Sequence, residues 1–98
     1  AIRSVYTPGS LAIALAKGAT TGKTIATVTG SSGTLSYKKN PTERATFDLA
    51  TGTYGGTALT SGTTEIAVAE GDIIEIVDIV STKVAKVGYI TVTAAVIK

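Results

Sequence analysis

Short apolar segments separated by glycine turns restrict the fold of this chain more than any other feature. The 98 residues include 18 threonines and 11 glycines, and valine and isoleucine dominate the apolar segments. β-Branched residues favour pleated strands, and the closely spaced glycines leave few windows long enough for a helix. The pattern predicts one all-β domain over residues 1–98. We expect an antiparallel β-sandwich or a small β-barrel of about eight short strands.

The longest apolar segment, residues 73–80, is predicted to be the central strand and to be buried on both faces. The Glu-Gly-Asp sequence at 70–72 lies between this segment and the alternating segment 65–69, a pattern typical of a β-hairpin. Gly88 is expected to interrupt the strand that follows. Inward positions on strongly apolar strands give the predicted core residues, which are Phe47, Ile74 and Ile76.

Residues 1–16 allow two arrangements. As an arm, they could extend from the domain and add a strand to the sheet edge of a neighbouring copy. Alternatively, they form the first two strands of the domain's own sandwich, as terminal strands often do. Residues 11–16 alternate large and small side chains, which favours a strand over a helix. The candidate assembly residues are Ile2, Val5, Tyr6, Leu11, Ile13 and Leu15.

No residue pattern in the chain supports catalysis. The absence of His and Cys removes His-based nucleophilic catalysis and the usual zinc sites. Residues 18–24 are similar to a phosphate-binding loop, but the two glycines are one residue too close and a strand follows them. Ser36 and Lys39 match a Ser-x-x-Lys pattern, yet in a strand they point to opposite faces. We therefore expect no catalytic residue, no cofactor and no enzymatic activity.

The charged residues are unevenly distributed along the chain. Five of the seven acids lie between residues 65 and 78, and six of the nine bases lie in the first 44 residues. Either the molecule has two ends of opposite charge and stacks head to tail, or acidic and basic strands are neighbours, which is the favoured interpretation. Glu75 and Asp78 are three residues apart and face opposite sides of a strand, so the acids predict no metal site.

The sequence also indicates which classes of partner to expect among nucleic acid, membrane and glycan. Tyr37, Lys38, Lys39 and Arg44 supply only one ring and three cations, so a nucleic-acid partner is not expected. No apolar segment approaches 18 residues, which predicts a soluble chain without membrane insertion. Tyr54 precedes two glycines. It is a candidate contact for a glycan through ring stacking, although packing of the ring over the bare glycine backbone is favoured.

Residues 54–79, from Tyr54-Gly-Gly-Thr to Glu-Ile-Val-Asp-Ile, resemble small β-rich bacteriophage virion proteins and Thr/Gly-rich modules of bacterial surface proteins. The first resemblance implies a capsid decoration, fibre or tail component that self-assembles on a particle. The sequence thus predicts a non-enzymatic structural protein, present in many copies in a virion. Its partners would be further copies and other structural proteins of the same particle. The alternative is an extracellular adhesion or carbohydrate-binding module at a cell surface.

Overall fold

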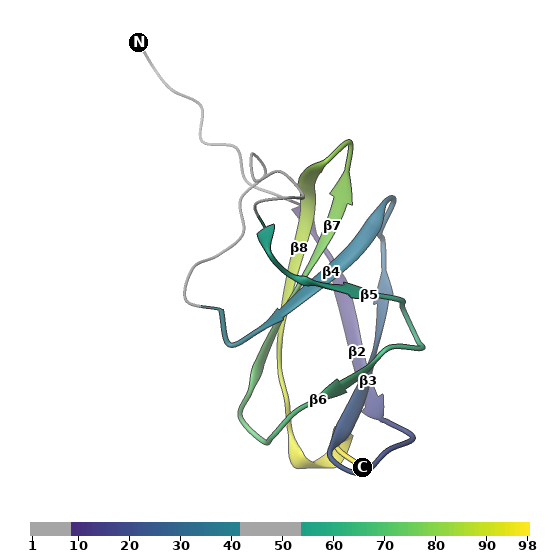
Figure 1. Ribbon diagram of the computed structural model, residues 1–98, viewed down its shortest axis with the longest axis vertical. Helices are drawn as coiled ribbons and strands as arrows, with labels where there is room; N and C mark the ends of the chain where they lie inside the picture. The colour runs from purple at the N-terminus through teal and green to yellow at the C-terminus, as the bar shows by residue number, and fades with distance from the viewer. Residues whose placement is uncertain (1–8, 42–53) are drawn as a thin grey trace.

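The computed structural model describes residues 9–41 and 54–98, and its strands form two facing sheets (Figure 1). One sheet has five strands in the order β1-β8-β7-β4-β5, and the other has three in the order β2-β3-β6. The described elements are β1 (Gly9–Ser10), β2 (Ala12–Lys17), β3 (Lys23–Thr29), β4 (Thr34–Lys39), β5 (Thr57–Leu59), β6 (Glu65–Ala67), β7 (Ile73–Val80), β8 (Lys83–Thr91) and the 3-10 turn η1 (Ala94–Val96).

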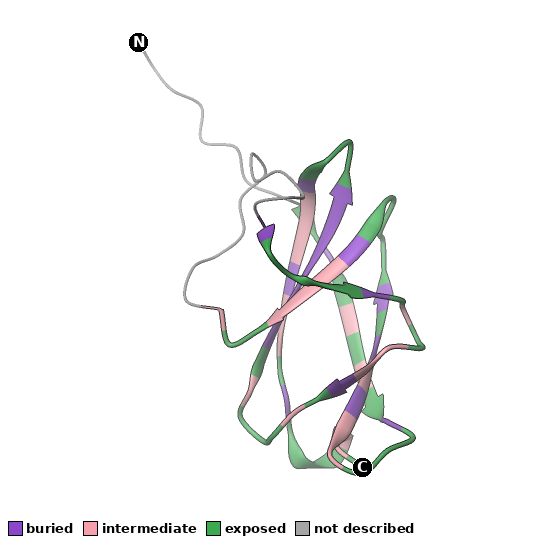
Figure 2. Ribbon diagram, in the orientation of Figure 1, coloured by how far each residue is buried: buried purple, intermediate pink, exposed green. Residues whose placement is uncertain are grey.

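This architecture confirms the predicted all-β fold and selects the sandwich over the barrel. All strand pairs are antiparallel except β1 with β8, where Gly9 and Ser10 run parallel to Lys86 and Val87. β7 has the predicted bounds, lies in the middle of the five-stranded sheet and is buried at all six positions from 74 to 79 (Figure 2). The prediction of a central strand buried on both faces is therefore confirmed.

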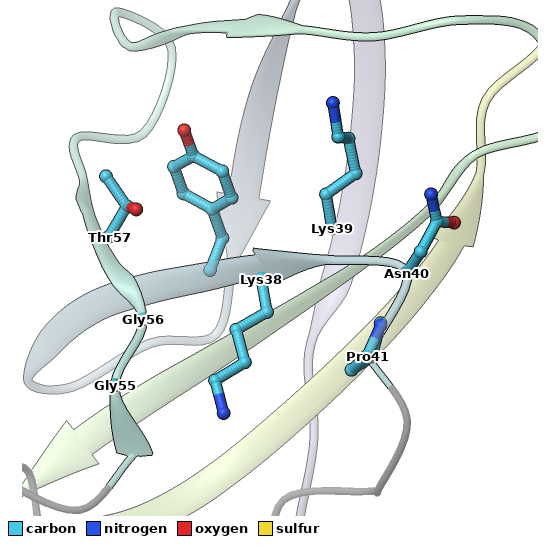
Figure 3. Close-up of a pocket in the computed structure, with 8 residues that line it drawn as sticks. Lys38, Lys39, Asn40, Pro41, Gly55, Gly56 and Thr57 are labelled. Carbon is cyan, nitrogen blue, oxygen red and sulfur yellow. The ribbon is translucent and has the colours of Figure 1, made fainter.

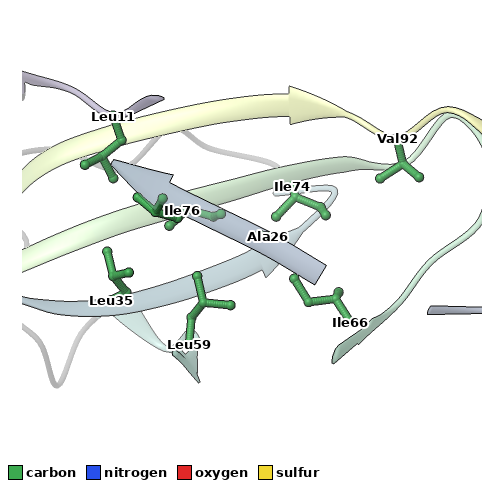
Figure 4. Packing of buried hydrophobic residues seen from close by; sticks show 9 residues of the cluster. Leu11, Ala26, Leu35, Leu59, Ile66, Ile74, Ile76 and Val92 are labelled. Carbon is green, nitrogen blue, oxygen red and sulfur yellow. The ribbon is translucent and has the colours of Figure 1, made fainter. Parts of the chain in front are cut away.

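The main core fills the space between the sheets (Figure 4). Ile74 and Ile76 of β7 are fully buried in this core, as predicted, whereas Phe47 lies outside the described residues. Ala26 of β3 faces them, and its small side chain allows the sheets to approach closely. A second apolar cluster covers the opposite face of the five-stranded sheet, and its buried members are Tyr54, Val77, Ile79 and Val84.

One sequence-based expectation about the connections between strands was wrong. Residues 70–72 do not close a hairpin, because β6 pairs with β3 in one sheet and β7 pairs with β4 and β8 in the other. The hairpin partner of β7 is β8, joined through Ser81 and Thr82, which both have positive φ angles. Alternation of apolar residues indicates that a segment is a strand but does not identify its partner.

Gly88 does not interrupt β8. It stays in the ladder opposite Ile76, at the place where the chain passes from β1 into β2. A Cβ atom at Gly88 would lie 2.7 Å from Cδ1 of Ile13 and 3.0 Å from the carbonyl oxygen of Leu11. The glycine therefore permits a close approach between the sheets. In a sequence, a glycine within a strand pattern can indicate either a break in the strand or such a close approach.

Candidate functional site

A buried carboxylate lies on the outer face of the five-stranded sheet. The sheet register places Lys38 of β4, Glu75 of β7 and Tyr89 of β8 side by side. Glu75 is fully buried. Its Oε1 accepts a 2.7 Å hydrogen bond from the Tyr54 hydroxyl, and its Oε2 accepts one from the Tyr89 hydroxyl at 2.5 Å. These two hydrogen bonds compensate for the desolvation of the carboxylate. We call Lys38, Tyr54, Glu75 and Tyr89 the tyrosine–carboxylate cluster.

The Tyr54 ring is enclosed in this cluster. Only 1% of the residue is exposed, and the Lys38 ammonium lies 4.5 Å from the ring centroid, a cation–π distance. A Cβ atom at Gly56 would lie 2.2 Å from the ring, so the ring packs against bare glycine backbone. This is the arrangement of the favoured packing interpretation. The ring presents no open face of the kind that glycan stacking requires.

The Tyr54 hydroxyl of this cluster stays protonated. Burial raises the pKa of the Tyr54 hydroxyl far above its usual value, and the hydrogen bond to Glu75 raises it further. Tyr54 therefore remains a hydrogen-bond donor at every physiological pH. A general base needs a pKa near the working pH, which this hydroxyl lacks.

Tyr54→Phe is expected to lower the free energy of unfolding by about 1.5–3 kcal/mol at neutral pH, because a hydrogen bond to a carboxylate is lost. The folded pKa of Tyr54 exceeds the unfolded value of about 10. The stability linked to this proton is therefore complete below about pH 10 and is lost as the pH rises above it. Urea unfolding at about pH 8 and about pH 11 should show a steeper alkaline loss for the wild type than for Tyr54→Phe.

The control for this experiment is Tyr37→Phe, which removes a hydroxyl from a half-buried tyrosine outside the cluster. It should retain the alkaline dependence of the wild type. Equal alkaline slopes for the wild type and Tyr54→Phe would contradict the assigned role of Tyr54.

A pocket of about 500 Å³ opens where β5 diverges from β4, and Gly55, with a positive φ angle, lies at this divergence. Lys38 and Lys39 both line it, but their side chains point to opposite faces of β4 (Figure 3). The Lys39 ammonium lies 3.0 Å from the Ala67 carbonyl oxygen and 3.9 Å from an Asp72 carboxylate oxygen. The two lysines therefore do not form one cationic surface with Tyr37. Arg44, which the sequence analysis grouped with these three residues as a possible nucleic-acid contact, lies outside the described residues.

Asp72 anchors the connection from β6 to β7. Its carboxylate accepts hydrogen bonds from the Ala69 N–H at 2.9 Å and from the Asn40 side-chain amide at 3.1 Å. These two bonds, in that order, lower the pKa of Asp72, and Lys39 adds a smaller contribution. Lys86 likewise lies opposite Asp78 in the sheet. Opposite charges are thus neighbours within the domain, as the favoured interpretation of the charge distribution predicts.

The acidic residues that the structure describes do not converge on one point. Within residues 9–41 and 54–98, no group of three or more His, Cys, Asp or Glu side chains could hold a metal ion. Glu75 binds tyrosine hydroxyls on the outer face, whereas Asp78 accepts hydrogen bonds from the backbone of the β3–β4 turn. Their opposite directions agree with their odd spacing along β7.

The predicted assembly residues divide into two groups. Leu11 is buried in the main core, and Ile13 and Leu15 are half-buried against it. The structure shows the alternative arrangement here: Ile13 and Leu15 belong to β2 of the domain's own sandwich, and Leu11 links β1 to β2. The remaining candidates, Ile2, Val5 and Tyr6, lie outside the described residues.

The outermost strands of the two sheets differ in length. β1, β5 and β6 have two, three and three residues, whereas β2 has six. Short edge strands offer few backbone groups for pairing, and proteins commonly protect longer ones with charges, prolines or bulges. β2 contains no proline and no bulge, and its single charge is the terminal Lys17. Within the described part of the molecule it is the longest outermost strand without a strand partner on its outer side, and we call it the open edge; η1 and β8 also lie close to this strand.

Comparisons of the chain with family models, with curated proteins and with solved structures give no match. Among the described residues, no helix has the length and apolar character needed to span a membrane.

Proposed function

We propose that this chain is a non-enzymatic structural protein that acts by self-association. The observation that supports this most directly is the open edge at β2, a six-residue strand that has no proline, no bulge and no charge before its terminal lysine. The strand retains polar backbone groups that a further strand would satisfy. Such an edge suits a structural function, because pairing along the edge gives affinity through main-chain hydrogen bonds and requires no reactive side chain.

The apolar residues beside this edge support the same proposal. Ile13 and Leu15 of β2 are only half-buried, and so are Ile90, Val96 and Ile97, which pack against the same core. The core is thus incompletely covered on the side where β2 lies. Partly exposed apolar residues that are contiguous with an open strand edge are typical of association surfaces.

We further propose that the assembly is a virion particle in which the protein is a multicopy decoration, fibre or tail component. This step rests on the resemblance of residues 54–79 to small β-rich virion proteins. The compact all-β domain and its predominantly Thr, Ser and Gly loops are suited to a surface repeated many times on one particle. The partners would be further copies of the chain and other proteins of the particle.

Sedimentation velocity over a wide concentration series, with negative-stain microscopy of the most concentrated sample, tests the self-association. We expect a concentration-dependent shift from monomer to a defined larger species. A monomer at every concentration would refute the proposed function. Counting the copies in purified particles by quantitative mass spectrometry tests the second step, and a protein absent from such particles would refute the virion assignment.

A further inference from the structure

We propose that two copies of this chain pair antiparallel along β2, about a two-fold axis at Ala14, to form a continuous six-stranded sheet. The strand order would be β6-β3-β2 followed by β2-β3-β6 of the second copy. This inference rests on the proposed function and names its partner and its interface. Three observations support it: the direction of the free backbone groups, the position of the only charge, and the side chains along the strand.

The hydrogen-bond pattern fixes which backbone groups of β2 are free. Gly18 N–H donates to the Lys23 carbonyl at 2.9 Å, which marks a hydrogen-bonded antiparallel pair just beyond the end of β2. Such pairs recur at every second residue, so the even-numbered residues of β2 bond to β3. The backbone groups of Ile13, Leu15 and Lys17 therefore point away from β3. Leu11, which has the same parity, confirms this direction, because its N–H donates to Val87 on the side away from β3.

These outward groups have no backbone partner among residues 9–41 and 54–98. A two-fold axis at Ala14 places Ile13 opposite Leu15 of the second copy, and Leu15 opposite its Ile13. Each of these two pairs is a hydrogen-bonded pair, in which both residues donate and both accept. The half-buried side chains of Ile13 and Leu15 then cover one another across the new junction, which extends the main core into the second copy.

The charge distribution favours a second copy in the antiparallel direction. Lys17 is the only charged residue of β2. In the antiparallel pair the two lysines lie at opposite ends of the junction, about 20 Å apart at 3.4 Å per residue. A parallel pair in register would instead place them side by side and would be destabilised by their repulsion. On the solvent face the pair brings together only alanines, at positions 12, 14 and 16, which do not clash.

A symmetric pairing makes a sharp prediction about distances. Ala14 faces Ala14 of the second copy in a non-hydrogen-bonded pair, where the Cα atoms are about 4.5 Å apart. This separation is within the range that a disulfide spans. Ala12 faces Ala16 of the second copy instead, and the two Ala12 residues are about 14 Å apart. Because the chain contains no Cys, each introduced Cys reports on one pair of positions only.

The first experiment is therefore oxidation of single-Cys variants, followed by non-reducing electrophoresis. Ala14→Cys should convert to a covalent dimer. Ala12→Cys and Ala16→Cys should remain monomeric when oxidised separately and should form a covalent heterodimer when mixed. All three alanines are exposed, so the variants should fold. A wild-type chain that self-associates while Ala14→Cys remains unlinked would overturn the β2 interface and leave the proposed function intact.

The second experiment introduces charge at the two-fold axis. Ala14→Lys and Ala14→Glu should each be monomeric at concentrations where the wild type associates, because like charges would face each other directly. An equimolar mixture of the two variants should restore association in low salt. Ala67→Lys is the matched control on β6, the opposite edge of the same sheet, and should associate like the wild type. Association of Ala14→Lys alone, or its loss in Ala67→Lys, would overturn the inference, and a wild type that never associates would refute both proposals.

Discussion

Replacing Ile76 with alanine is expected to lower the free energy of unfolding by about 2–5 kcal/mol. Ile76 is fully buried at the centre of β7, between β4 and β8, and belongs to the core between the two sheets. Its side chain is surrounded by residues from both sheets, so the cavity left by truncation cannot be filled by the movement of a single neighbour. The loss therefore combines the transfer free energy of the deleted atoms with the cost of that cavity.

Urea unfolding measures this effect. Ile76→Ala should lower the midpoint while the slope with denaturant remains unchanged, because the surface exposed on unfolding is nearly the same. Ile73→Ala is the matched control, since it removes the same atoms from the same strand at a position that is 43% exposed. We expect its effect to be below about 1 kcal/mol. Equal midpoints for Ile76→Ala and the wild type would contradict the position assigned to β7 in the core.

The position of β7 could be predicted from the sequence because continuous apolar residues are required only where both faces of a strand are buried. Its partners could not be predicted in the same way. The segment at 65–69 alternates like a hairpin partner, yet β6 joins the other sheet and residues 70–72 cross between the sheets. The choice depends on register and on contacts between residues distant in the sequence, and local alternation carries no information about either.

The contacts of the tyrosine–carboxylate cluster could likewise be predicted only in part from the sequence. The sequence indicated that Tyr54 would pack over glycine, and the close approach of Gly56 to the ring agrees with this interpretation. The sequence did not indicate that the hydroxyls of Tyr54 and Tyr89 would both donate hydrogen bonds to the same carboxylate. An acid in the middle of the longest apolar segment was the available signal, because a buried Glu needs hydrogen-bond donors. Their identity follows only from the pairing of β7 with β8 and from the fold of the segment that contains Tyr54.

Asp78, the second buried acid of β7, connects this strand to the turn between β3 and β4. Its Oδ2 accepts a hydrogen bond from the Ser32 N–H at 2.8 Å, and its Oδ1 accepts one from the Gly33 N–H at 2.7 Å. The turn packs tightly on β7, since a Cβ atom at Gly33 would lie 2.1 Å from the Ile79 carbonyl oxygen. Water therefore has little room to replace the carboxylate. The turn depends on Asp78 for the two acceptors that its backbone needs.

Asp78→Ala is accordingly expected to lower the free energy of unfolding by about 3 kcal/mol, because two charge-assisted hydrogen bonds are lost and two N–H groups remain without acceptors. Asp78→Asn retains one acceptor oxygen and should lose about half as much. The control is Asp72→Ala, which also removes a carboxylate that accepts a backbone N–H. Its side chain is 19% exposed, so water can replace the oxygen, and the loss should stay below about 1 kcal/mol.

Amide hydrogen exchange distinguishes this local role from a general loss of stability. In Asp78→Ala the amides of Ser32 and Gly33 should exchange faster relative to those of β7 than they do in the wild type, because the turn would open without unfolding of the strand. Ile76→Ala, which weakens the core without touching the turn, should accelerate both sets through global unfolding. If the Ser32 and Gly33 amides kept their wild-type protection relative to β7 in Asp78→Ala, the carboxylate would not be what holds the turn to the sheet.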